Sequence, residues 1–321
     1  MKQNLTPIVQ ALALLACMST GAIAQTPAEE PGQLERVTVS GSAAASSLDA
    51  KTGSSSRLSL SIKETPASVT LIDRASIEAR GATNTQEILK SVPGVIFADP
   101  PGSAGSLFYR GFGSGSLAQL YNGISVQYDA IAARPVDSWI VDRVEAIGGP
   151  SSFLNGSGAV GGTINVITKI ADGSGDLGRI LLGLGERAQA SASLQRSLSD
   201  SGQVLRLELN RSEGALWTQG RDRSAWQAAA SWLAPLNSTL THTLALERQH
   251  EKVLQPYWGT PMLRAADGSV SGPLRFDPGT YGVNYNVVDG RYEQDVTWTR
   301  SILEWKLNAD TQLSHTLYHY D

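Results

Sequence analysis

Residues 142–169, DRVEAIGGPSSFLNGSGAVGGTINVITK, contain the pattern that most limits how this chain can fold. A strand-like run, Arg143 to Ile147, leads into the breaker Gly148-Gly149-Pro150. A glycine-dense stretch follows, and then a second strand-like run, Thr163 to Thr168, that is rich in β-branched residues. Glycine supplies the positive φ angles of tight turns, and β-branched side chains favour strands. The segment therefore predicts two strands joined by a glycine-rich turn.

The same glycines match a dinucleotide-binding fingerprint, Gly156-x-Gly158-x-x-Gly161. That fingerprint requires a helix that opens at its third glycine and an acidic residue about 20 positions further on. Here a run with little helical character, Thr163 to Thr168, follows the glycines. We therefore favour the β-turn over a nucleotide site.

The first 24 residues have the form of an export signal. Lys2 gives a weak positive start, Ile8 to Met18 is an apolar run, and Ala22-Ile23-Ala24 is a small-x-small cleavage site. The run is too short to span a bilayer, so we expect the mature chain to begin at Gln25. A lipoprotein cleavage site at Leu14-Leu15-Ala16-Cys17 is the alternative, although Leu15 suits it poorly.

Cys17 is the only cysteine, and it would leave with the signal. The mature chain would then form neither a disulfide nor a cysteine-ligated metal site. No later run reaches ~18 apolar residues, so no transmembrane helix is expected. The net charge of −4 gives no basic footprint for a nucleic acid. An exported protein of this kind is periplasmic, secreted, or an outer-membrane barrel.

Residues 25–60 have the composition of a flexible linker, rich in Pro, Ser, Ala and Gly. Such a segment buries too little apolar surface to offset the entropy of ordering. Within it, Leu34 to Gly41 alternates valines with polar residues, as a short strand without a partner would. A segment of this kind is able to add to the sheet edge of another protein. A disordered tail with two chance valines is the alternative.

Residues 61–170 have the pattern of a small mixed α/β domain. The expected elements are strands at Val69 to Ile72 and Val95 to Phe97 and a helix at Thr85 to Ser91. Asn84 is placed to cap that helix, with Glu87 three residues on as in a capping box.

From about Arg179 the pattern changes to long alternating strands, in a region that we delimit as residues 176–321. Seven strands are predicted, at residues 179–185, 188–197, 203–213, 223–234, 238–250, 294–307 and 311–320. In Leu205 to Asn210 the apolar side chains point one way and the polar ones the other. That is typical of a barrel wall with a lipid-facing side and a wet lumen, although a soluble sandwich gives the same alternation. Tight turns that alternate with longer loops, above all Glu251 to about Glu293, favour the barrel.

Three phrases resemble the plug domain of the TonB-dependent outer-membrane siderophore receptors. They are ETPASVTLIDRASIEARGATNTQEILKSVPGV at Glu64–Val95, FYRGFGSGSLAQLYNGI at Phe108–Ile124, and the segment at residues 142–169. They follow one another in the order found in the family. The chain is therefore identified as the N-terminal part of such a receptor, with a signal peptide, a plug domain and the first barrel strands. The resemblance implies an α+β plug domain followed by the start of a transmembrane antiparallel β-barrel.

Barrels of this family have 22 strands and a plugged lumen, whereas about seven strands are predicted here. An open sheet of seven strands in lipid would leave the backbone groups of its edges unsatisfied. We therefore expect the chain to be a fragment of a longer receptor or the product of a truncated gene, without a working pore of its own.

The resemblance implies a gated importer of the outer membrane that catalyses no reaction. Its partners would be outer-membrane lipid, a ferric siderophore, and TonB with the inner-membrane proton-motive complex. Iron would arrive as a chelate, so neither a resident cofactor nor a metal bound directly by protein ligands is expected. TonB would pull on a short N-terminal segment, the TonB box. Our candidates for this box are Glu35, Arg36, Val37, Thr38 and Val39.

In the family, chelate contacts come from plug loops that flank the RGF and DGI phrases. Carried over by position, the candidate ligand-binding residues are Ser103, Ser106, Ser114, Gly115, Ser116, Tyr128 and Arg134. Tyr128 offers an aromatic face and a hydroxyl, and Arg134 offers a cation for a hydroxamate or carboxylate chelate. A plain surface-loop role is the alternative for each of them.

Arg110 and Arg143 match family arginines that hold the plug to the barrel wall by ion pairs, and Glu145 is assigned to the same contact. The family usually has Arg-Gly-Pro where this chain has Gly148-Gly149-Pro150. One plug–wall ion pair of the family therefore lacks its arginine here.

Two other interpretations remain open. One is a TonB-dependent receptor for another large solute, such as a cobalamin or a glycan. The other is a soluble periplasmic α+β binding protein with a β-rich second half. An enzyme is not expected, because the sequence contains neither a P-loop nor a paired-carboxylate arrangement.

Overall fold

A computed structural model describes residues 61–65, 67–98, 106–125, 136–151, 159–185, 187–198, 201–215, 222–256, 262–263, 275–276 and 282–321. All of them fall in one compact unit that begins at Ser47. The predicted signal peptide, linker and TonB box lie outside the described residues. In the described part of the chain, no helix is long and apolar enough to cross a membrane.

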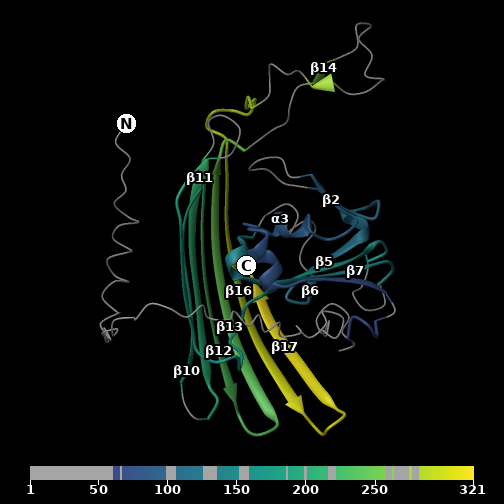
Figure 1. The fold of residues 1–321 in the computed structure, drawn as a ribbon, viewed down its shortest axis with the longest axis vertical. Coiled ribbons are helices and arrows are strands. Elements are labelled where there is room, and N and C mark those ends of the chain that lie inside the picture. The colour runs from purple at the N-terminus through teal and green to yellow at the C-terminus, as the bar shows by residue number, and fades with distance from the viewer. Residues whose placement is uncertain are drawn as a thin grey trace, which may run out of the picture. The chain divides into compact units, whose positions relative to one another are not determined.

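The N-terminal domain is built on a five-stranded sheet with the order β1-β7-β8-β5-β6. Figure 1 labels β5, β6 and β7 of this sheet. Its strands are β1 (Ser68–Ile72), β5 (Leu117–Tyr121), β6 (Ile124–Ser125), β7 (Val141–Gly148) and β8 (Gly162–Thr168). β5 runs parallel to β8, and the other neighbours are antiparallel. A second antiparallel sheet consists of β2 (Val95–Ala98), β3 (Ser106–Tyr109) and β4 (Phe112–Gly113). The two strands predicted on either side of the glycine-dense turn are therefore confirmed as β7 and β8.

Short helices complete this domain: α2 (Arg74–Ala79), α3 (Thr85–Leu89), and the 3-10 turns η2 (Ser114–Ser116) and η3 (Ser138–Ile140). The predicted cap of α3 is confirmed, because the Asn84 side chain accepts a hydrogen bond of 3.0 Å from the backbone N–H of Glu87. Glu87 in turn accepts one of 2.6 Å from the backbone N–H of Thr83. The sequence did not predict α2, whose N-cap is Asp73.

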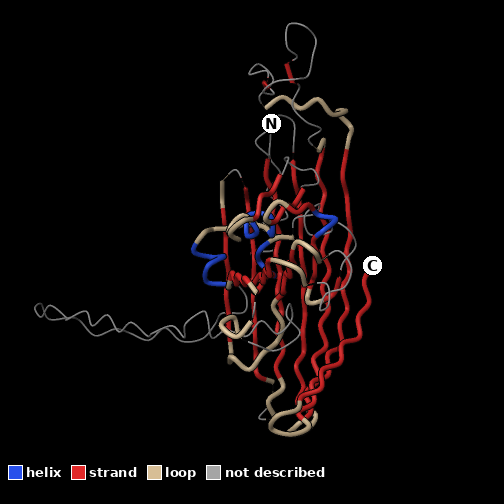
Figure 2. Tube along the Cα trace, turned by 90° about the vertical axis from the view of Figure 1, so that its right-hand side faces the viewer, coloured by secondary structure: helices blue, strands red, loops and turns tan. Residues whose placement is uncertain are grey.

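The second half of the chain forms one antiparallel sheet of seven long strands (Figure 2), called here the long-stranded sheet. In spatial order these are β17 (Gln312–Tyr320), β16 (Arg291–Lys306), β13 (Leu240–Leu254), β12 (Asp222–Pro235), β11 (Val204–Ala215), β10 (Arg187–Ser197) and β9 (Leu177–Gly183). All seven predicted strands are observed, with ends that differ by at most four residues from the prediction. β9 and β17 are its edges, so the sheet is not closed among the described residues.

The predicted loop from Glu251 to about Glu293 contains more structure than expected. β13 continues to Leu254, and β16 already begins at Arg291. Between them, β14 (Met262–Leu263) pairs with β15 (Arg275–Phe276).

The two faces of the long-stranded sheet have opposite chemistry, as β11 shows. The side chains of Arg206, Glu208 and Asn210 are buried, whereas Leu207 and Leu209, which lie between them, are exposed. A water-soluble protein buries the leucines of an amphipathic strand and exposes the charges. This sheet does the reverse.

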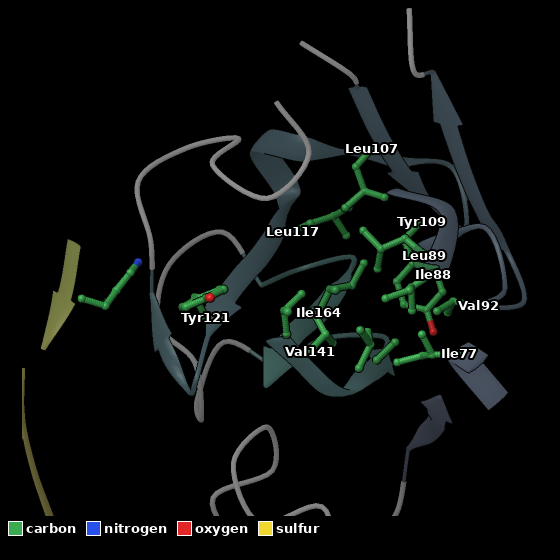
Figure 3. Close-up of a cluster of buried hydrophobic side chains, with 14 residues drawn as sticks. Ile77, Ile88, Leu89, Val92, Leu107, Tyr109, Leu117, Tyr121, Val141 and Ile164 are labelled. Atoms are coloured by element: carbon green, nitrogen blue, oxygen red, sulfur yellow. The ribbon is translucent and has the colours of Figure 1, made fainter. Parts of the chain in front are cut away.

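The core of the N-terminal domain is apolar and includes one residue of the long-stranded sheet. Its buried members are Ile77, Ile88, Leu89, Val92, Leu107, Tyr109, Leu117, Tyr121, Val141, Val144, Ala146, Ile164, Val166 and, from β16, Trp298 (Figure 3). The rings of Tyr121 and Trp298 stack with their centroids 5.1 Å apart. The N-terminal domain and the long-stranded sheet are therefore joined by an apolar contact.

Replacement of Asp73 tests the cap of α2. The Asp73 side chain accepts a hydrogen bond of 2.8 Å from Ser76 N, and the hydrogen bonds from Ser76 lower the pKa of Asp73 below its usual 3.8. We expect Asp73→Ala to lower the free energy of unfolding by about 1 kcal/mol at neutral pH, because the N-cap acceptor is lost. Asp73→Asn keeps an acceptor and is the matched control.

Wild type also differs from both variants in its pH dependence, because neither alanine nor asparagine titrates at position 73. A depressed carboxyl pKa stabilises the fold above pH 3.8, and this contribution disappears as the pH falls through the lowered value. Urea denaturation near neutral pH and well below pH 3.8 measures it. We expect the gap between wild type and Asp73→Asn to change with pH, and a constant gap would contradict the assigned cap.

Candidate functional site between the N-terminal domain and the long-stranded sheet

The buried face of the long-stranded sheet carries polar side chains that require partners. Those with less than a tenth of their surface exposed are Ser191, Ser193, Gln195, Arg206, Glu208, Asn210, Ser212, Gln227, Ser231, Thr243, Glu247, Glu251 and Arg300. Buried polar atoms are almost always hydrogen-bonded. Several of these partners come from the N-terminal domain, and their contacts define the candidate site.

Glu247 of β13 lies at the centre of one cluster. One carboxylate oxygen accepts a 2.8 Å hydrogen bond from the Tyr121 hydroxyl, and the other accepts a 2.5 Å bond from the Thr168 hydroxyl. Arg300, on the neighbouring strand β16, donates to Glu247 at 2.6 Å and to Thr168 Oγ1 at 3.0 Å. Gln249 donates to the Tyr121 oxygen at 3.1 Å. We call Tyr121, Thr168, Glu247 and Arg300 the Glu247 cluster.

The chain reaches this cluster through a tight hairpin between β5 and β6. Asn122 and Gly123 both have positive φ angles, 55° and 78°, as the favoured two-residue Asn-Gly turn requires. The Asn122 side chain accepts a 2.9 Å hydrogen bond from the backbone N–H of Thr168, so it ties the turn to the end of β8. Burial raises the pKa of Tyr121 well above its usual value, and the Glu247 carboxylate adds to the effect. The Tyr121 hydroxyl therefore remains a donor at any physiological pH.

A second cluster surrounds Glu208 of β11. Lys169 lies 3.3 Å from one carboxylate oxygen of Glu208, while Arg206 and Ser193 contact the other oxygen at 2.8 Å and 2.6 Å. The Lys169 ammonium also lies 4.7 Å from the centre of the Trp139 ring, within the range of a cation–π contact. Burial lowers the pKa of Lys169 to about 8, and the charge of Glu208 opposes that shift.

The segment that joins the two domains is held by Gln195 of β10. Its amide nitrogen donates to the side chain of Asp172 at 2.9 Å and to the carbonyl of Gly175 at 2.8 Å. Burial would raise the pKa of Asp172, but hydrogen bonds from Ser174 and Gln195 outweigh it, so that the pKa is lowered. The first residues after β8 are therefore fixed to the sheet.

Two further ion pairs link the domains. Glu78 of α2 pairs with Arg74 of the same helix at 2.5 Å and with Arg179 of β9. Asp137, which caps the turn η3, pairs with Arg187 of β10.

A cavity of about 320 Å³ adjoins both clusters. Residues of both domains line it, among them Asn122, Arg143, Thr168, Lys169, Arg206 and Arg300. The junction is therefore well connected by hydrogen bonds but not packed solid.

The predicted ligand-binding residues lie away from this junction or outside the described residues. Ser103, Tyr128 and Arg134 belong to the second group. Ser106 begins β3 and is exposed, while Ser114, Gly115 and Ser116 form η2, which packs against β3. The structure thus brings the described candidates to neighbouring elements.

The three residues predicted to hold the plug to the wall make their contacts differently. Arg143 pairs with Asp142 at 2.8 Å and with Glu145 at 3.0 Å, all on β7. Arg110 donates to the hydroxyl of Ser68 on β1 at 2.5 Å. These interactions join residues of the N-terminal domain, and the contacts with the long-stranded sheet described above involve Tyr121, Thr168 and Lys169.

Arg110 occupies the space beside Gly148, the position where the family usually has arginine. A Cβ atom built on Gly148 would lie 2.8 Å from Cζ of Arg110 and 2.9 Å from the hydroxyl oxygen of Tyr109. Arg110 itself has a positive φ of 51°, an uncommon conformation for a side chain of this size. Glycine at position 148 therefore leaves room for the Arg110 side chain.

The glycine-dense segment also allows a close approach of its backbone to β4. A Cβ atom on Gly161 would lie 2.3 Å from Cβ of Phe112, and Gly161 N–H donates to the carbonyl of Ser116 at 2.8 Å. Gly161 therefore serves close packing, and a strand, β8, rather than a helix follows it, which agrees with the preference against a nucleotide site.

Comparison with known proteins identifies the N-terminal domain. Residues 61–163 match the family model described as TonB-dependent Receptor Plug Domain. Residues 61–163 are therefore a plug domain of the kind found in TonB-dependent receptors. The long-stranded sheet is the partial barrel of the same fold, and we call it the wall from here on.

Solved structures support the fold over most of the chain. The ferripyoverdine receptor of the Pseudomonas aeruginosa outer membrane superposes with a TM-score of 0.70 at 22% identity, over 84% of this chain and 36% of that one. A siderophore receptor of Acinetobacter baumannii superposes with a TM-score of 0.74 at 23% identity, over 85% and 39%.

Curated relatives match over shorter lengths. The vitamin B12 transporter of Vibrio vulnificus is 36% identical over 152 residues, which are 46% of this chain and 25% of the relative. The ferrioxamine B receptor of Salmonella typhimurium is 32% identical over 112 residues, which are 33% and 16%. The chain thus spans a quarter or less of these curated relatives.

Sequence reasoning missed the residues that join plug and wall. Tyr121 and Glu247 are 126 positions apart, and nothing local pairs them. The available signal was the presence of charged residues at inward positions of β11, Arg206 and Glu208, where a barrel wall faces its lumen.

Replacement of Gly161 tests the close approach of the glycine-dense segment to β4. We expect Gly161→Ala to lower the free energy of unfolding of the plug by about 1–3 kcal/mol, because Phe112 must move. Gly173→Ala is the control, since an added Cβ meets nothing within 4 Å there, and its effect should stay within about 0.5 kcal/mol. Urea denaturation of both variants measures this, and equal effects would contradict the packing described.

Proposed function

We propose that this chain is part of an outer-membrane receptor that imports ferric siderophores under the control of TonB. The observation that carries the proposal is the inverted wall, apolar outside and charged inside, with a plug domain hydrogen-bonded to the charged side. A wall of this kind suits lipid on one face and a wet, plugged lumen on the other.

The outer face of the wall supports a location in lipid. Its exposed apolar side chains are Ile180, Leu182, Leu194, Leu207, Leu209, Trp232, Leu244, Leu246, Trp305, Leu313 and Leu317, from all seven strands. A contiguous apolar surface of this extent is rare on monomers in water. β10 to β13 and β16 have 11 to 16 residues each, enough for tilted transmembrane strands, which need about 9–11 residues.

The names of relatives support the choice of cargo. Ferrioxamine B and ferripyoverdine receptors are among the curated relatives, at 32% identity each. We propose that iron crosses as such a chelate, without direct protein ligands or a resident cofactor. The match to a vitamin B12 transporter at 36% identity favours a cobalamin as the second candidate.

We propose roles for the residues that the structure leaves untested. Ser103, Ser106, Ser114, Gly115, Ser116, Tyr128 and Arg134 would contact the chelate. Glu35, Arg36, Val37, Thr38 and Val39 would pair with TonB, and residues 1–24 would direct export. These assignments rest on the positions of the residues in the family pattern.

A charge placed on the outer face of the wall tests its contact with lipid. We expect Leu209→Arg to reduce insertion into lipid vesicles, because an arginine near the bilayer midplane costs about 2–4 kcal/mol. Leu236→Arg is the control, since Leu236 is equally exposed but lies in the turn after β12. Recovery of the chain with vesicles after dilution from urea measures the effect. Equal recovery of both variants, or a monomer that is soluble without detergent, would contradict the proposed location.

Titration with chelates tests the cargo. We expect tryptophan fluorescence of the detergent-solubilised chain to change with ferrioxamine B or ferripyoverdine, and less with the iron-free chelators. Arg134→Ala should weaken binding about tenfold, the effect of about 1.4 kcal/mol, while Arg196→Ala, an exposed arginine of β10, should not. Tighter binding of cyanocobalamin would favour the second candidate, and equal effects of the two variants would contradict the role of Arg134.

A further inference from the structure

The two buried carboxylates of the wall that contact the plug each have a cationic partner on the wall itself. Glu247 of β13 pairs with Arg300 of β16, and Glu208 pairs with Arg206, two residues before it on β11. All four side chains are less than a tenth exposed. The plug is therefore not needed to neutralise either carboxylate.

The plug groups that contact Glu247 are uncharged. Tyr121 and Thr168 each donate a hydroxyl hydrogen bond, at 2.8 Å and 2.5 Å, and carry no charge. Burial keeps the pKa of Tyr121 high, so this donor does not ionise. Glu78 of the plug has a similar arrangement. Its cationic partner on the plug itself is Arg74, and Arg179 of the wall is a second partner.

Two plug groups depart from this arrangement. Asp137 takes its cation, Arg187, from the wall, and Lys169 takes its anion, Glu208, from the wall. Burial lowers the pKa of Lys169 to about 8, although the charge of Glu208 opposes that shift. Most of the buried charged side chains at the junction therefore have a partner of opposite charge in their own domain, as the two wall pairs show.

We propose that the Glu247–Arg300 pair neutralises the wall at the Glu247 cluster, so that the plug is held there by hydroxyl hydrogen bonds and leaves this cluster without breaking an ion pair. The Glu208–Arg206 pair leaves Glu208 with a cation when its ion pair with Lys169 of the plug opens. A buried pair that loses one partner is strongly destabilising, because the remaining charge stays desolvated. Docking of the plug onto Glu247 without Arg300 would create that situation.

This inference rests on the proposed function, since only a transporter has to release its plug. Its test needs neither a chelate nor a membrane. The cysteine-labelling test described below does not depend on chelate binding. If labelling contradicts this inference, the import proposal still stands, and if chelate binding fails, the labelling result still stands.

Cysteine accessibility measures plug detachment in the whole chain in detergent, with Cys17→Ser as the background. Ala171→Cys places a thiol at the junction, where Ala171 is buried and its backbone N–H donates to Ser231 at 2.7 Å. Ala146→Cys places one in the plug core, on β7. Labelling of the first thiol alone reports detachment, and labelling of both reports unfolding, because a buried thiol reacts only in the open fraction.

Removal of one member of the wall pair should expose the junction. We expect Arg300→Met to accelerate labelling at position 171 at least about tenfold, with position 146 still protected. Glu247→Gln in the same chain should bring the rate back to within about threefold of wild type, since no charge is then left buried. Wild-type labelling in Arg300→Met, no recovery in the double variant, or equal acceleration at position 146 would each overturn the proposal.

At the Glu208 cluster, removal of the wall cation Arg206 is compared with removal of the plug cation Lys169, since both pair with Glu208. Arg206→Met should accelerate labelling at position 171 more than Lys169→Met does, because Lys169→Met leaves Glu208 with its wall partner. A larger effect of Lys169→Met would mean that the plug supplies the essential cation, and would overturn the proposal.

Discussion

The structure depends on the need to satisfy a row of buried charges on one face of a sheet. Glu247, Glu208, Arg300 and Arg206 lie on long strands whose opposite face is leucine-rich. Such a sheet cannot bury its apolar face against a core and leave its charges in water in the usual way. The plug covers the charged face and brings hydroxyl donors, an ammonium group and backbone N–H groups to it. The position of β5, β8 and the segment after β8 follows from this requirement.

The elements of the fold could be predicted from the sequence to a large extent, because their signals are local. Alternation of apolar and polar residues fixed the seven wall strands to within four residues, and Asn84 with Glu87 marked the start of α3. α2 was missed because its six residues give too short a pattern, although its N-cap, Asp73, is a common capping residue. The last residues of β13, Glu251 to Leu254, were assigned to the loop that follows the strand.

The site was much less predictable, because its contacts join residues far apart in the chain. Family position suggested Arg110, Arg143 and Glu145 for the plug–wall contact, yet the ion pairs of Arg143 and the hydrogen bond of Arg110 stay within the plug. Glu247 and Arg300 carry no motif, and only the register of β13 with β16 brings them together. The substitution at Gly148 was visible in the sequence, but its consequence for Arg110 required coordinates.

Trp298 has a consequence for the order in which the molecule assembles. Its ring stacks on Tyr121 and belongs to the plug core, although it lies 177 positions later in the chain. β5 likewise finds its parallel partner only when residues 162–166 are present. During synthesis, which begins at the amino end, the plug therefore emerges well before its core is complete. Contacts of such long sequence separation close slowly, so the early chain has to be kept apart from other unfolded chains until β16 arrives.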